Sequence, residues 1–276
     1  MFGSLVIIYP TPHEGGELVL RHKDHEWKID AKDLTASQSS PSLAYVAFYS
    51  DIEHEVLKVT SGRRVTVTYN LYLVDTSLEP QAPVVTTNAQ SVSAFKTTLQ
   101  ALLNSPEFLP NGGILGFGLA HLYPFTSDTD LNDMEECLKG EDWHVYQACQ
   151  ELWLWPSLQM IYDEDRSGSE YGLMMDRIIK GPNYDSEYSS YKSALLRNLG
   201  GVSVNKTEST GLRLTRSSTW IHDRDMDGEV ITWVSPFNDR NQLQDTSMAY
   251  GNEDTVGYLY CSPCLIARIR DTSNRV

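Results

Sequence analysis

The chain has 276 residues, of which 41% are hydrophobic and 21% are charged. This composition excludes a disordered or collagen-like chain and is sufficient for a sizeable core. The 37 acidic residues exceed the 22 basic ones and give a formal net charge of -15. Because this charge repels phosphate backbones and no cluster of Lys and Arg offsets it, we expect no nucleic-acid partner.

The N-terminal segment predicts neither export nor membrane insertion. Residues 1–10 carry no basic region and no small-residue cleavage site, which argues against a signal peptide. Their apolar run is far shorter than a membrane span. We therefore expect an intracellular protein, cytoplasmic or nuclear, without a membrane partner.

The 4 cysteines are too few for a disulfide framework at this length. Cys261 and Cys264 form a CxxC motif, but a structural zinc site needs two further ligands and the chain has no second such pair. We expect these two cysteines to be small residues in a C-terminal strand.

Short strands joined by turns are predicted for the first third of the chain. Apolar and β-branched runs place strands at residues 5–9, 17–21, 27–30, 43–50 and 64–73, with a polar loop at 31–42. The first two strands are expected to form a hairpin with a long loop. This pattern is typical of an antiparallel sandwich or barrel.

The remainder of the chain predicts a second, mixed region. Residues 79–91 are polar, include Pro80 and Pro83, and are expected to form a linker between a domain at 1–78 and an α+β region at 92–276. Helices are predicted at 93–104, 131–138, 142–152 and 192–199, strands at 114–120, 158–162, 230–234 and 258–269, and a loop at 184–191.

The predicted strand that begins at Arg64 alternates in polarity. Arg64, Thr66 and Thr68 fall on one face, and Val65, Val67 and Tyr69 fall on the other. A cation with two hydroxyls suits a wall around a polar ligand. An ordinary half-buried strand with a surface arginine fits the same pattern, so both interpretations remain open.

Several motifs in the first third occur in a characteristic order. They are Glu14-Gly15-Gly16-Glu17-Leu18, the strand at 44–50, His54-Glu55-Val56, and Thr60-Ser61-Gly62-Arg63-Arg64-Val65-Thr66. On these residues the chain resembles the Fe(II)- and 2-oxoglutarate-dependent oxygenase superfamily, in its prolyl 4-hydroxylase-like branch. Large fungal multidomain members are the most similar, because residues 138–140 and 250–253 also resemble their C-terminal region.

The resemblance implies a double-stranded β-helix, a jelly-roll or cupin-like core, within an α+β chain. In this family a His-x-Asp/Glu pair and a distal histidine hold iron. His54 matches the distal histidine, and Arg64 matches the cation that binds the far carboxylate of 2-oxoglutarate, with Thr66 as an added hydroxyl donor. The implied activity is a dioxygenase reaction that hydroxylates a protein or small-molecule substrate, with ascorbate as an optional reductant.

One feature departs from the family pattern. The His-x-Asp pair of the family comes before the strand that residues 5–9 match, and this sequence has no such pair there. We therefore expect a β-helix incomplete at its N-terminus and an impaired activity. His22 and Asp24 form the one other His-x-Asp pair, but they fall where a solvated hairpin turn is predicted. The alternative function is a non-catalytic, degenerate β-helix that serves protein interaction.

The other polar motifs predict structural roles. His121, His144 and His222 lie outside the motif region and have no partner at catalytic spacing. Residues 223–228 resemble the start of a calcium loop, but no closing glutamate follows at the required position, so a polar loop is expected.

Overall fold

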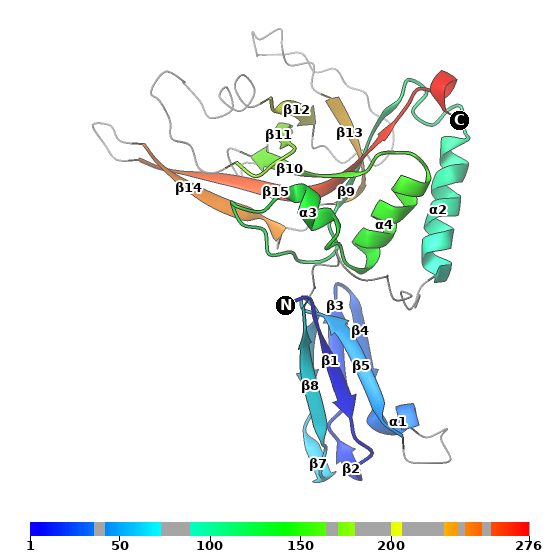
Figure 1. Cartoon of the computed structure of the whole chain (residues 1–276), viewed down its shortest axis with the longest axis vertical. Helices are drawn as coiled ribbons and strands as arrows, with labels where there is room; N and C mark the ends of the chain where they lie inside the picture. Colours follow the sequence, from blue (N-terminus) through cyan, green and yellow to red (C-terminus); the bar gives the residue numbers. More distant parts are fainter. Residues whose placement is uncertain are drawn as a thin grey trace, which may run out of the picture. The chain divides into compact units, whose positions relative to one another are not determined.

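The structure is a computed structural model that describes residues 1–35, 42–72, 89–163, 171–179, 200–205, 229–236, 241–249 and 255–275 (Figure 1). The chain divides into two compact units, Met1–Val84 and Val85–Val276, which we call unit 1 and unit 2 and describe separately. Both are rich in strands, mostly antiparallel, with few helices among the described residues, so the predicted α+β class is confirmed. No helix in the described part of the chain has the length and apolarity of a membrane span.

Unit 1 consists of short strands and one short helix. The elements are β1 (Gly3–Ile8), β2 (His13–Gly15), β3 (Leu18–His22), β4 (His25–Ile29), α1 (Ala31–Thr35), β5 (Ala44–Tyr49), β6 (Glu53–Val56), β7 (Val59–Gly62) and β8 (Thr66–Leu71). The helix α1 occupies the first five residues of the predicted loop at 31–42, so this prediction is wrong in part. Its start is favoured by Asp30, whose carboxylate accepts the backbone N–H of Lys32.

These strands form two three-stranded sheets and a ribbon. Sheet I has the order β5-β1-β8, sheet II has the order β4-β3-β6, and β2 pairs with β7. The predicted hairpin between the first two strands is wrong, because β1 pairs with β5 and β8 and not with β3. The turn after β1 contains Pro10 and Pro12, which lack the N–H groups that a hairpin ladder requires, and it carries the chain into β2 instead.

The faces of β8 follow the predicted alternation. Thr66 and Thr68 lie opposite Ile8 and Val6, which are buried, so the hydroxyls share a face with the interior of unit 1. We call this the inner face of sheet I. The strand itself begins at Thr66 rather than at Arg64, although the N–H of Tyr9 extends the ladder by donating to the carbonyl of Val65.

The outer face of sheet I is apolar and open. It carries Leu5 and Ile7 in the centre, with Tyr45, Val67 and Tyr69 on the flanking strands. Tyr45 is 72% exposed and Tyr69 is 52% exposed. β8 therefore turns hydroxyls inward and aromatic surface outward, the reverse of an ordinary surface strand.

Unit 2 contains three helices and seven strands among its described residues. They are α2 (Ala89–Leu103), β9 (Gly113–Gly118), α3 (Leu131–Glu135), α4 (Gly140–Glu151), β10 (Ser157–Asp163), β11 (Tyr171–Met175), β12 (Val202–Asn205), β13 (Glu229–Ser235), β14 (Leu243–Ala249) and β15 (Thr255–Ile269), followed by a short 3-10 turn, η2 (Thr272–Asn274). Asp130 caps α3 by accepting the N–H of Asn132.

The sheet of unit 2 closes on itself. Its order is β10-β11-β12-β13-β9-β15-β14, and β15 also pairs with β10. The ring encloses one apolar cluster, in which Ile114, Ile161, Met174, Val204, Ile231, Cys264 and Ile266 are buried and Val202 and Trp233 pack against them. Gly116 is required on β9, because an added Cβ would come within 2.6 Å of the rings and methyls of Trp233 and Ile231.

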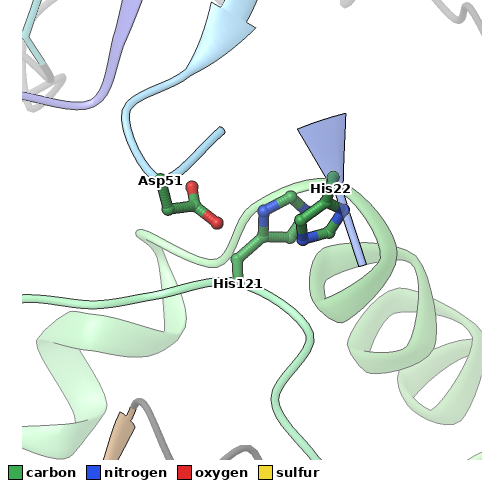
Figure 2. Close-up of side chains that lie close together, drawn as sticks. All are labelled: His22, Asp51 and His121. Carbon is green, nitrogen blue, oxygen red and sulfur yellow. The ribbon is translucent and has the colours of Figure 1, made fainter. Parts of the chain in front are cut away.

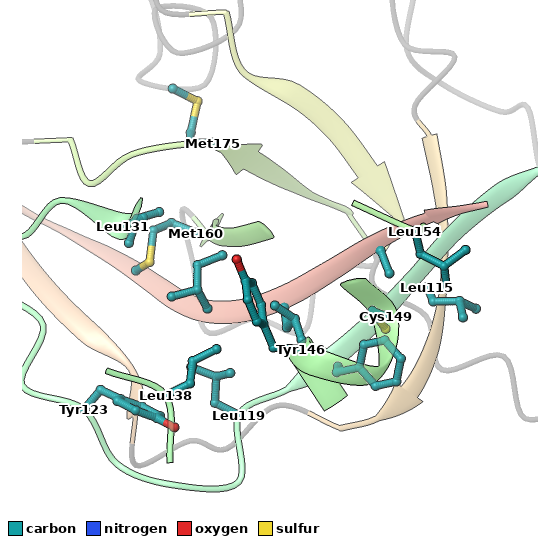
Figure 3. Packing of buried hydrophobic residues seen from close by; sticks show 14 of the residues in the cluster. Leu115, Leu119, Tyr123, Leu131, Leu138, Tyr146, Cys149, Leu154, Met160 and Met175 are labelled. Atoms are coloured by element: carbon teal, nitrogen blue, oxygen red, sulfur yellow. The ribbon is translucent and has the colours of Figure 1, made fainter. Parts of the chain in front are cut away.

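A larger cluster covers the other face of that ring (Figure 3). Strand residues such as Leu115 and Met160 pack there with Leu99 of α2 and with Tyr146 and Cys149 of α4. The predicted apolar stripe of the helix at 142–152 is therefore core, as expected. Alternate residues of one strand thus fill two different clusters, which explains the near-continuous apolar runs of β9, β10 and β15.

The predicted helices at 93–104, 131–138 and 142–152 and the strands at 114–120, 158–162, 230–234 and 258–269 are confirmed, with shifted ends. β11, β12 and β14 were not predicted. β14 is a polar segment without alternation, and it is a strand because β15 pairs along its whole length. The predicted loop at 184–191 and helix at 192–199 lie outside the described residues, as does most of the predicted linker at 79–91.

Candidate functional site

His54 lies on β6, at the edge of sheet II, opposite Leu20 of β3. Its ring is 4.8 Å, centroid to centroid, from the ring of Phe48 on the inner face of sheet I. The two sheets therefore face each other across this pair. His54 remains exposed, since β6 has no further strand beside it in the sheet.

The hydrogen bonding of His54 determines which ring nitrogen is free. Nδ1 lies 3.1 Å from the carbonyl oxygen of Ile52. A carbonyl only accepts, so Nδ1 carries the proton and Nε2 of the neutral ring keeps its lone pair. Metal-bound histidines commonly have this arrangement, in which the other nitrogen donates to a backbone carbonyl.

Arg64 lies in the loop between β7 and β8, where its neighbour Arg63 donates a backbone N–H to Pro12. The side chain is half-buried, and this burial lowers the pKa of the guanidinium below its usual value. No carboxylate of the described residues pairs with it. A partly buried guanidinium without a counter-ion is an incomplete arrangement that an anion completes.

The stem of Arg64 packs against Gly16. A Cβ added to Gly16 would lie 2.9 Å from Cδ of Arg64 and 2.8 Å from Cγ2 of Val59. Gly16 also has φ +76°, in the left-handed region where glycine is favoured. The second glycine of the Glu14-Gly15-Gly16 motif thus provides the space that the arginine stem occupies.

Thr66 follows Arg64 by two residues and lies on the inner face of sheet I. Thr68 and Asn70 continue this polar row toward the level of Phe48. Arg64 lies in the loop that leads into β8 and is outside the strand itself, so the predicted common face of Arg64 and Thr66 stays a prediction. His54 belongs to the opposite sheet and makes no hydrogen bond or ring contact with either of them.

Lys23 and Asp24 form the turn between β3 and β4, directly after His22 at the end of β3. Lys23 has φ +53°, and Asp24 is exposed in the turn, as the sequence predicts for a hairpin tip. A carboxylate oxygen of Asp51, from the turn after β5, lies within 4.8 Å of a ring nitrogen of His22. Figure 2 shows the side chains of His22 and Asp51. The third residue that it labels, His121, belongs to unit 2.

His121 is part of a buried polar network in unit 2. The carboxylate of Asp142 accepts the backbone N–H groups of Ala120 and His121, at 2.7 and 3.0 Å, and the hydroxyl of Tyr123 at 2.7 Å. Asn241 accepts the N–H of Tyr123 and donates to the carbonyl of His121. Burial raises the pKa of Asp142, although its hydrogen bonds oppose that change. The network holds the segment after β9 in place, and we assign it a structural role.

The cysteines also have structural roles. Cys261 and Cys264 on β15 belong to the two different apolar clusters, so they lie on opposite faces of the sheet. Neither a shared metal nor a disulfide is compatible with this placement. Burial raises the pKa of Cys149 to about 12 and raises that of Cys264 further, so both thiols are poor nucleophiles at neutral pH.

Sequence reasoning missed Thr11 and His13. His13 is only 8% exposed, its Nδ1 lies 2.6 Å from the carbonyl of Thr11, and its Cδ2 lies 3.7 Å from the position of a Cβ on Gly16. The hydroxyl of Thr11 is buried and has no hydrogen-bond partner. The available signal was the position of His13, two residues before the double glycine.

Three sequence features lie outside the described residues: His222, the loop at 223–228 and the segment at 250–253. Comparison of the chain with family models, with curated proteins and with solved structures finds no match.

Proposed function

We propose that unit 1 is a double-stranded β-helix of the Fe(II)- and 2-oxoglutarate-dependent oxygenase type, and that it binds 2-oxoglutarate through Arg64 and Thr66. The observation that carries the proposal is the half-buried side chain of Arg64, which has no carboxylate partner among the described residues and precedes Thr66 of β8 by two residues. A planar guanidinium binds a carboxylate by two parallel hydrogen bonds, and a nearby hydroxyl adds a third.

The strand arrangement supports this proposal. A jelly roll has roughly eight strands in two facing sheets. Unit 1 has two three-stranded sheets that face each other at Phe48 and His54, and each sheet ends in a strand that pairs on one side within the sheet. Together with the β2–β7 ribbon, these sheets give unit 1 eight strands.

The donor set for iron is incomplete in the described part of the chain. His54 has the tautomer of a metal ligand, but it is not in any group of three potential ligands there. Iron in this family supplies the hydroxylation of a substrate C–H bond. His54 alone does not fit a resident iron, so we assign no iron-dependent step to this chain and expect weak or no hydroxylation from it.

His22 offers a second, less favoured route to a metal. Its ring nitrogen lies near a carboxylate of Asp51, not in a strand pair with Asp24 as the sequence alternative required. An Fe(II) titration of the chain and of His22→Ala tests this route. Equal affinity of the two proteins for Fe(II) excludes His22 as a ligand.

The alternative function is a non-catalytic interaction module. The exposed apolar outer face of sheet I, with Tyr45 and Tyr69, favours it, because monomeric proteins rarely expose contiguous apolar surface of this kind. The oxygenase function implies a protein or small-molecule substrate, whereas the interaction module implies a protein partner.

Calorimetric titration with 2-oxoglutarate tests the proposed function directly. We expect binding by the chain and a loss of at least about tenfold in affinity for Arg64→Ala, since one bidentate carboxylate contact is removed. The matched control is Arg63→Ala, which removes an exposed arginine next in the chain and should leave the affinity unchanged. Equal binding by the two variants, or no binding by the unmodified chain, would overturn the proposal.

A second measurement addresses catalysis. Succinate formation from 2-oxoglutarate in the presence of Fe(II) should be at or near background for the chain. Turnover that is lost in His54→Ala but retained in His25→Ala would show that the site is completed by ligands we have not assigned. The interaction-module alternative requires instead that Arg64→Ala leaves the biological activity intact.

A further inference from the structure

The helix α4 of unit 2 ends in a turn whose backbone conformation is normally supplied by glycine. Leu152 is the C-terminal cap of the helix. The N–H of Trp153 donates to the carbonyl of Gln150, and the N–H of Leu154 donates to the carbonyl of Cys149. This pair of bonds is the Schellman motif, in which the residue after the cap is left-handed and is usually glycine. Here that residue is Trp153, with φ +58°.

A second tryptophan follows in the same unfavourable conformation. Trp155 has φ +42°, and a side chain with a Cβ is disfavoured there. Burial does not compensate either indole, because Trp153 is 76% exposed and Trp155 is 53% exposed. Leu154, between them, packs into the larger apolar cluster (Figure 3). Leu154 and the helix end therefore account for the turn, but not for the two tryptophans that it exposes.

Trp155 carries a cation on its ring. The guanidinium carbon of Arg270 lies 4.3 Å from the centroid of this ring. A guanidinium that stacks on an indole keeps the N–H groups at its edge available as donors. No carboxylate of the described residues pairs with Arg270. We call Trp153, Trp155 and Arg270 the tryptophan–arginine patch.

The acids that lie nearest to the patch in the chain have other partners. Glu151 forms an ion pair with Lys96 of α2. The carboxylate of Asp271 accepts the hydroxyl of Ser273 and the side-chain amide of Asn274. The edge of the Arg270 guanidinium therefore remains for a carboxylate from another molecule.

The residue types of the patch favour a peptide as the partner. Tryptophan and arginine dominate the energy of protein–protein contacts, since an indole buries a large area and a guanidinium binds a carboxylate by two parallel hydrogen bonds. Single-stranded nucleic acids also stack on aromatic rings. The net charge of -15 opposes such a chain of phosphates. A peptide with one or two carboxylates meets less repulsion, because salt screens charges beyond about 8 Å.

We propose that the tryptophan–arginine patch is a docking site for a short acidic peptide of a partner protein. Apolar side chains of the peptide cover the two indoles, and one of its carboxylates binds Arg270. The site belongs to unit 2 and does not depend on the function proposed for unit 1.

The experiment is a selection of displayed random short peptides on the intact chain, followed by titration of the enriched peptides. We expect these peptides to combine Asp or Glu with neighbouring apolar residues. Arg270→Gln should weaken their binding by about tenfold or more, because it removes a charge-assisted contact. The matched control is Arg177→Gln, which alters an exposed arginine of unit 2 that pairs with Asp176 and should leave the affinity unchanged.

The variant Trp153→Gly separates docking from folding. It should weaken binding of the same peptides by about tenfold or more, because it removes an exposed indole. Glycine suits the left-handed position, so the melting temperature of unit 2 should rise by about 2–4 °C. Leu102→Gln, which alters an exposed apolar residue of α2, is the control and should leave the affinity unchanged. A lower melting temperature of Trp153→Gly would show that the indole serves the fold, and would overturn the proposal.

Other outcomes would also overturn the docking site. One is the absence of any enriched peptide, and another is enrichment of peptides without acidic residues. Equal binding of the peptides by Arg270→Gln or Trp153→Gly and by the unmodified chain is a third. Tighter binding of single-stranded oligothymidylate than of the peptides, lost in Trp153→Gly, would assign the patch to nucleic acid instead. None of these results bears on the binding of 2-oxoglutarate by unit 1.

Discussion

The interiors of the two units are built in opposite ways. Unit 2 closes its sheet into a ring and fills it with apolar side chains such as Ile231 and Cys264, which are fully buried. Unit 1 leaves its two sheets separate and turns Thr66 and Thr68 toward the space between them. A large filled interior provides stability, whereas unit 1 has only a small apolar cluster around Val6, Ile8 and Ala44, with hydroxyls beside it on β8 that can serve binding. We therefore expect substitutions to affect stability mainly in unit 2 and binding mainly in unit 1.

The largest expected effect is on the closed ring. Ile231→Ala should destabilise unit 2 by about 4 kcal/mol, because it removes a side chain with no exposed surface and leaves a cavity. Val234→Ala, on the same strand but 54% exposed, is the control and should change stability by less than about 0.5 kcal/mol. Hydrogen exchange resolved by peptide assigns the change to each unit. Similar effects of the two substitutions would contradict the filled interior.

The next effect concerns the polar network that unit 2 does bury. Asp142→Ala should cost about 3 kcal/mol, since it leaves two N–H groups and the hydroxyl of Tyr123 without their acceptor. Asp133→Ala, which removes an exposed acid from the first turn of α3, is the control. Denaturant unfolding followed by hydrogen exchange measures both. A cost below about 1 kcal/mol would show that water replaces the carboxylate.

The same residue predicts a pH dependence. The pKa of Asp142 is raised in the folded state, chiefly by burial, so the folded chain binds this proton more readily than the unfolded chain. Its contribution to stability is therefore present at low pH and lost as the pH rises through the folded value. The stability of the chain relative to Asp142→Asn should increase as the pH falls from neutrality toward 3.8, the ordinary value. A difference independent of pH would contradict the assigned direction.

The smallest effect concerns the interior of unit 1. Thr68→Val should stabilise unit 1 by about 0.5 kcal/mol, because valine favours a strand and packs beside Val6 on the same face, whereas the exposed Thr68 makes no hydrogen bond in the described part of the chain. Thermal unfolding together with hydrogen exchange in β1 and β8 measures this change. Destabilisation by more than about 1 kcal/mol would contradict the prediction, because it would show that the hydroxyl of Thr68 stabilises the fold.

The extent of prediction from sequence differs between features of these units. The faces of β8 were predictable, because the two-residue period of a strand needs only local alternation. The partners of β1 were not, since pairing with β5 and β8 depends on contacts 36 or more residues away in the chain. His13 was missed for the same reason: its neighbourhood with Arg64 arises from the fold of the segment around Gly16. The role of Asp142 depends on a loop 21 and 22 residues before it.

β15 joins more of unit 2 than any other described strand, through its pairing with β9, β10 and β14. It is also the last strand of the chain to be synthesised among those described. β9 and β10 therefore leave the ribosome well before β15 is synthesised. Until then, the strand edges that pair with β15 have no partner. Unit 1 has no such dependence, because all its sheet partners lie within residues 1–72. The order of synthesis favours early folding of unit 1, and it makes unit 2 the part of the nascent chain that most needs protection by chaperones.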